Sequence, residues 1–201
     1  MALQNYTDLA TAVASWMHRS DLTSVIPDFV TLAQKRIVRD IVGKGGHSAL
    51  EDSTTISFSA ASADLPTDFL AVRSVNTNTT VSYRIPVVSY DTLKTAYSTP
   101  GNGKACAISG TKIHVSPDVY NNYSAVLNYY KEPVEISVSQ ATNDLFPVAS
   151  DAYLYAALIE ASIYTKGDPS TWASAYNAAI QNFLNTDRKS KFGSNLSVVA
   201  A

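Results

Sequence analysis

The pattern of apolar positions changes twice along the chain. It has a helical period up to about residue 50, a period of two from about residue 53 to residue 131, and a helical period again after about residue 146. Leu9, Val13 and Trp16 form the first apolar stripe. This stripe predicts a helix from about Thr7, its expected N-cap, to about His18.

A second helix is predicted from Pro27, because proline suits the first turn, to the glycines at 43, 45 and 46 that end it. Its apolar face is expected to comprise Ile26, Phe29 or Val30, Ala33, Ile37 and Ile41.

The middle of the chain predicts short strands. Ile56 and Phe58 alternate with Ser and Thr, and a hairpin is expected to close around Ser109-Gly110-Thr111. Alternation through residues 125–129 predicts a final strand, and residues 89–97 a short helix capped by Ser89. Residues of roughly 53–131 are therefore expected to form a mostly antiparallel β region.

Two further helices are predicted at the C-terminal end. Ser150 or Asp151 is expected to cap the first, whose narrow seam is Leu154, Ala157, Leu158 and Ala161. Gly167-Asp168-Pro169 interrupts the chain and starts the last helix. The face of that helix is marked by Trp172, Tyr176, Ile180 or Ala179, Phe183 and Asp187.

These elements predict an α+β fold in which a small four-helix bundle carries an inserted, mostly antiparallel β region. We assign 1–52 to the N-terminal helices, 53–135 to the β insertion, 136–190 to the C-terminal helices and 191–201 to an extended tail. The tail follows a short basic stretch and ends apolar. A frayed terminus and a segment that docks on a partner both fit this pattern.

Composition narrows the classes of function. Charged residues make up only 16% of the chain, against about a quarter in ordinary domains, and the net charge of −2 comes without a basic cluster for nucleic acid. One cysteine excludes an internal disulfide and a cysteine-based zinc site. No apolar run reaches the ~18 residues of a membrane span. The N-terminus does not resemble a secretion signal, so we expect synthesis in a reducing cytoplasm.

Motifs for chemistry are weak. No pair of histidines has metal-ligand spacing, and the glycine runs at 43–46 and 101–103 lack the order of a phosphate loop. Asp64 and Asp68 flank a turn and are the one carboxylate pair worth testing in a glycosidase such as a peptidoglycan hydrolase. We expect no enzyme activity, no cofactor and no metal.

Short motifs in succession along most of the chain resemble one protein family, the head-to-tail adaptors of tailed bacteriophages. The N-terminal motifs are Tyr6-Thr7-Asp8-Leu9, Trp16, Arg19, Ile26-Pro27-Asp28-Phe29 and Leu32-Ala33-Gln34-Lys35-Arg36-Ile37. The later ones are Leu65-Pro66-Thr67-Asp68-Phe69-Leu70, Ile108-Ser109-Gly110, Tyr129-Tyr130-Lys131 with Pro133, and Asp151-Ala152-Tyr153-Leu154-Tyr155-Ala156-Ala157-Leu158.

The resemblance implies a structural virion protein at the head–tail junction, made in the host cytoplasm and forming a ring, usually of twelve copies. Such a ring docks under the portal protein, contacts a tail or nozzle protein, and continues the channel through which DNA passes without sequence-specific binding. The C-terminal segment of similar proteins often reaches the portal. The residues that would do so here are Arg188, Lys189, Lys191, Phe192, Leu196, Val198 and Val199. A tail-tube or tail-completion subunit is the alternative, and a peptidoglycan hydrolase the second alternative.

Overall fold

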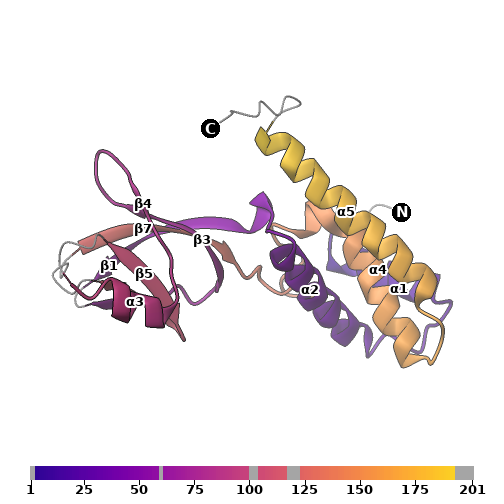
Figure 1. The fold of residues 1–201 in the computed structure, drawn as a ribbon. Coiled ribbons are helices and arrows are strands. Elements are labelled where there is room, and N and C mark those ends of the chain that lie inside the picture. The colour runs from indigo at the N-terminus through magenta and orange to yellow at the C-terminus, as the bar shows by residue number, and fades with distance from the viewer. Residues whose placement is uncertain (1–2, 59–60, 100–103, 117–122, 193–201) are drawn as a thin grey trace. The chain divides into compact units, whose positions relative to one another are not determined.

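The computed structural model describes residues 3–58, 61–99, 104–116 and 123–192 (Figure 1). It divides into two compact units. The helical unit comprises residues 1–50 and 133–201, and the β unit comprises residues 51–132. The predicted α+β class with antiparallel sheets is confirmed.

The helical unit contains four long helices, with α4 at their centre. They are α1 (Tyr6–Trp16), α2 (Ile26–Gly43), α4 (Phe146–Tyr164) and α5 (Ser170–Phe192), and the short 3-10 turn η1 (Ser48–Leu50) follows α2. α4 contacts α1, α2 and α5. The predicted seam of α4 is buried, and Tyr153, Ala156 and Ile159 are buried as well. Burial on most sides is what a central helix requires.

The predicted face of α2 is confirmed: Ile26, Phe29, Val30, Ala33, Ile37 and Ile41 are all buried. The helix ends where Gly45 and Gly46 adopt positive φ angles of 103° and 83°. Gly46 N–H donates to the carbonyl of Ile41 at 2.9 Å, which closes the last turn of the helix.

The predicted cap of α1 was wrong. Asn5, not Thr7, caps α1, because its side-chain oxygen accepts the Asp8 N–H at 3.0 Å. α4 begins at Phe146, where Asn143 Oδ1 accepts the N–H at 2.8 Å, but the helix is kinked at Ala149, whose φ of −136° and ψ of 27° are not helical. Regular helix therefore resumes at Ser150 and Asp151, where the sequence predicted its start.

A buried amide organises the chain where it returns to the helical unit. Gln34 of α2 donates through Nε2 to the carbonyls of Pro133 and Val134 at 3.0 and 3.1 Å. Its Oε1 accepts from Ile136 N–H and Tyr153 O–H, each at 3.3 Å, and Asn143 Nδ2 lies at the same distance. The side chain thereby satisfies irregular backbone that has no secondary-structure partner.

The β unit contains two antiparallel sheets. The four-stranded sheet has the order β1-β7-β3-β4, formed by β1 (Glu51–Phe58), β7 (Tyr123–Lys131), β3 (Phe69–Thr77) and β4 (Arg84–Ile85). The three-stranded sheet has the order β2-β6-β5, formed by β2 (Ser62–Asp64), β6 (Lys112–Ser116) and β5 (Ala105–Ser109). The predicted hairpin joins β5 to β6, and Gly110 has the positive φ (59°) that this turn requires.

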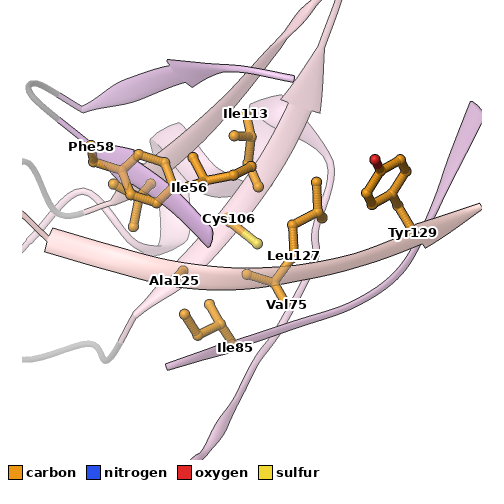
Figure 2. Close-up of a cluster of buried hydrophobic side chains, with 10 residues drawn as sticks. Ile56, Phe58, Val75, Ile85, Cys106, Ile113, Ala125, Leu127 and Tyr129 are labelled. Atoms are coloured by element: carbon orange, nitrogen blue, oxygen red, sulfur yellow. The ribbon is translucent and has the colours of Figure 1, made fainter. Parts of the chain in front are cut away.

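The segment after β4 links the two sheets. Val87 forms a parallel bridge with Cys106 of β5, where Cys106 N–H donates to the Pro86 carbonyl at 3.0 Å. The apolar residues enclosed by the strands are Ile56, Phe58, Val75, Ile85, Cys106, Ile113, Val115, Ala125, Leu127 and Tyr129 (Figure 2). The predicted short helix is α3 (Tyr90–Ala96), where the Ser89 side chain accepts the Thr92 N–H.

Candidate interaction site at the end of α5

The helix α5 continues through the basic stretch, which corrects the predicted start of the tail at residue 191. It ends at Phe192, so Arg188, Lys189 and Lys191 lie on its last turns. Leu184 is the last buried apolar residue among those described on α5, and Asp187 is buried three residues later. Leu196, Val198 and Val199 lie outside the described residues.

Asp187 is the centre of a polar cluster in the helical unit. Its side chain is only 4% exposed. Oδ1 accepts from the Ser48 hydroxyl at 2.5 Å and from the Ser48 N–H at 3.3 Å, and Oδ2 pairs with Lys191 Nζ at 3.0 Å. Burial opposes ionisation of Asp187, but its bonds from Ser48 and Lys191 outweigh burial and lower its pKa. The cluster therefore holds a buried carboxylate in its charged form.

His47 completes this cluster. Its ring stacks on Phe183 of α5, with ring centroids 3.7 Å apart and an interplanar angle of 9°. Nδ1 accepts the Ala49 N–H at 3.0 Å, so the proton of the neutral ring lies on Nε2, which is 3.9 Å from Asp187 Oδ1. The turn that follows α2 is thus attached to α5 by one aromatic contact and several polar contacts.

These residues border a shallow groove of about 410 Å³. Val148 and Phe183 supply part of its apolar lining, and Asp151 and Thr186 part of its polar lining. Val148 is 56% exposed. Near the groove, Arg188 is exposed on α5 and Lys191 faces Asp187, while nothing is described of the side chains of Lys189 and Phe192.

The geometry of the cluster differs from that of a nucleophilic triad, although serine, histidine and aspartate are all present. The Ser48 hydroxyl donates its hydrogen bond to Asp187, whereas the hydroxyl of a catalytic serine donates its hydrogen bond to the histidine that will accept its proton. The one lone pair of the neutral His47 ring is occupied by the Ala49 N–H. This arrangement is suited to holding the turn after α2 against α5.

The two aspartates considered for hydrolysis have separate partners. Asp64 is 78% exposed and pairs with Lys112 Nζ at 2.6 Å. Asp68 accepts from the Tyr129 hydroxyl at 3.1 Å, and burial together with this bond raises the pKa of Tyr129 to about 12. Within residues 3–58, 61–99, 104–116 and 123–192, no group of histidine, cysteine or carboxylate residues could hold a metal ion. No helix among them is long and apolar enough to span a membrane.

Sequence reasoning placed Arg188 and Lys191 at this site but did not bring His47 and Ser48 to it. These residues are 139 positions from Asp187 or more, so no local pattern connects them. The one signal was Asp187 itself, an acid in line with the apolar face of the last helix.

Comparison with known proteins gives one family match. The family model described as SU10 adaptor protein matches residues 4–198, nearly the whole chain. No curated protein matches the chain.

Proposed function

Because the chain belongs to the SU10 adaptor protein family, a family of phage adaptor proteins as its motif order indicated, we propose that it is the subunit of a ring at the head–tail junction of the virion. In this proposal about twelve copies bind under the portal protein, contact a tail or nozzle protein, and surround the channel through which DNA passes without sequence-specific contacts. The protein is made in the host cytoplasm and then joins the virion. The observation that carries the proposal is the family match over residues 4–198.

The helical unit would act as a small four-helix bundle that gives each subunit a rigid body. Support for rigidity comes from α4, whose middle part (152–162) is mostly buried and which contacts the other three long helices. Ala152, Ala156, Ala157 and Ala161 of α4 are fully buried. Small side chains at these positions let neighbouring helices approach closely, and such close packing resists deformation.

We place portal binding at the end of α5 and the residues that follow it. Arg188 is exposed there, and no hydrogen bond or ion pair engages its guanidinium within the described part of the chain. Cations on the last turn of a helix also complement the negative end of the helix dipole. A portal segment that carries carboxylates would fit this end of the helix.

We also propose that the chain has no catalytic activity. The separate environments of Asp64 and Asp68, and the engagement of the His47 lone pair by a backbone N–H, support this proposal. A zymogram on peptidoglycan at several pH values tests it, and clearing by the purified protein would refute it.

Mass measurement of the protein mixed with the portal protein of the same phage tests the assembly. We expect a complex with the portal and about twelve bound copies, even where the free protein is a monomer. Binding to tail components without binding to the portal would instead support a tail-completion subunit.

Charge reversal tests the contact. Arg188→Glu should weaken portal binding, because it replaces the exposed cation of the helix end by an anion. Arg84→Glu is the matched control, since Arg84 is an exposed arginine of β4 in the β unit. Equal affinity of Arg188→Glu and Arg84→Glu for the portal would refute the contact.

A further inference from the structure

We infer that Asp187 is a positioning residue for partner binding: it holds the last turns of α5 against the His47–Ser48 turn, so that the basic end of the helix is presented in an ordered form. The inference rests on the proposed docking role of this helix end. It adds that the docking site depends on residues of the turn after α2, far away in sequence.

The end of a helix needs such a support. The last four carbonyls of a helix have no partner within it, and the final turn frays where nothing holds it. The sequence of α5 offers little apolar packing beyond Leu184, which is the last buried apolar residue of the helix among those described. Asp187 lies one turn after Phe183, and its buried carboxylate takes the place of an apolar anchor.

The bonds of Asp187 act on both sides of this anchor. Toward the turn after α2, Oδ1 accepts from the hydroxyl and the N–H of Ser48, and the neighbouring His47 ring stacks on Phe183. Toward the helix end, Oδ2 pairs with Lys191 one turn later, and such i,i+4 pairs stabilise helical turns. One carboxylate therefore joins the turn after α2 to the last turn of α5.

The chemistry of the partner follows from the charged side chains that the ordered last turn of α5 presents. Arg188 and Lys191 are three residues apart and thus lie on neighbouring positions of the helix surface. An ordered last turn fixes the spacing of their charges. A frayed turn would have to become ordered on binding, and the conformational entropy lost in this step would weaken the affinity. The surface thus fits an acidic segment of the portal protein.

The test uses full-length Asp187→Asn, which keeps the shape of the side chain and removes its charge. Asp151→Asn is the matched control, because Asp151 borders the same groove but is exposed. Hydrogen bonds to charged groups are stronger than those between neutral groups, and Asp187→Asn removes the charge that strengthens them. We therefore expect amide hydrogen exchange of residues 188–192 to be at least about tenfold faster in Asp187→Asn than in the control, and affinity for the portal to be about tenfold lower.

Ser48→Ala provides a second, milder variant, since it removes one donor and leaves the carboxylate; it should change both quantities in the same direction. Circular dichroism of each variant verifies that the helices form. If Arg188→Glu and Arg84→Glu bind the portal equally well, the proposed docking role fails. If Arg188→Glu weakens binding while Asp187→Asn changes neither amide exchange nor affinity, the positioning role of Asp187 is refuted and the docking role stands.

Discussion

The buried amide of Gln34 provides a sharp test of how the helical unit is held together. Truncation by Gln34→Ala removes the acceptor of three donors, Ile136 N–H, Tyr153 O–H and Asn143 Nδ2, of which only the last has another acceptor among the described residues, the Val134 carbonyl. Ile136 is 4% exposed and Tyr153 is fully buried, so water does not readily replace the lost amide. The carbonyl of Pro133 loses its donor as well.

The magnitude follows from these losses. A buried polar group left without a partner costs about 1–3 kcal/mol. The bonds to Oε1 from Ile136 and Tyr153 are 3.3 Å long, which favours the lower end of this range for each. Alanine gains only a few tenths of a kcal/mol in helix propensity over glutamine. We therefore expect Gln34→Ala to lower the free energy of unfolding of the helical unit by about 3 kcal/mol.

Denaturant unfolding followed by circular dichroism at helical wavelengths measures this change, because the long helices all belong to the helical unit. Gln181→Ala is the matched control, a glutamine on the exposed side of α5. Its effect should stay within about 0.5 kcal/mol. If Gln34→Ala destabilises the helical unit by less than about 1 kcal/mol more than Gln181→Ala does, the view of Gln34 as an organising residue is wrong.

Three further predictions concern other parts of the chain. Leu127→Ala in the core of the β unit, where Leu127 is fully buried, should cost about 3 kcal/mol in denaturant unfolding, and a loss under about 1 kcal/mol would contradict the assigned core. Burial raises the pKa of the Cys106 thiol to about 12, so a thiol reagent at pH 8 should label the native protein only through unfolding; labelling within minutes would show that the thiol is accessible. Because the folded-state pKa of Asp187 lies below its ordinary value of 3.8, its stabilising contribution is present above about pH 4 and is lost as pH falls through the folded pKa. Stability should accordingly fall less steeply in Asp187→Asn than in the wild type over this acid range, and equal slopes would contradict it.

Much of the fold followed from periodicity, because the helices and strands each bury one face. The stripe of α2 and the seam of α4 are local patterns, and every member proved to be buried. The hairpin around Gly110 followed from turn chemistry that acts over a few residues. Where a local signal decides the structure, the sequence alone suffices.

The wrong predictions concern choices among several local signals. Thr7 and Asn5 are both good caps, and the structure uses Asn5, whose side chain reaches the Asp8 N–H. For α4, the sequence missed the turn before the kink at Ala149, where Asn143 Oδ1 accepts the Phe146 N–H. Asn143 is itself placed by Gln34 and by the Val134 carbonyl at 2.7 Å. A turn that depends on a contact with a residue about a hundred positions away cannot be predicted from its neighbours in sequence.

The same reason explains what was missing from the candidate site. Composition and motif order pointed to the basic residues after Asp187, but the residues that contact Asp187 follow a glycine run that was considered only as the end of a helix and as a phosphate loop. Gly45 and Gly46 do adopt conformations that favour glycine, and the turn they produce places His47 and Ser48 against α5. The glycine content of the run thus does not predict which residues the turn places against another helix.

Gln34 and Asp187 have one role in common within the helical unit. Asp187 binds the turn that immediately precedes residue 51, and Gln34 binds the segment that immediately follows residue 132; these are the two places where the chain leaves and re-enters this unit. Both segments are irregular, so their backbone groups would be left without partners unless side chains from the helices satisfied them. Gln34 and Asp187 are buried on otherwise apolar helix faces, and each satisfies backbone groups at one of these two connections: Gln34 donates to the Pro133 carbonyl, and Asp187 accepts the Ser48 N–H. A continuous apolar face at either position would leave those backbone groups without this partner.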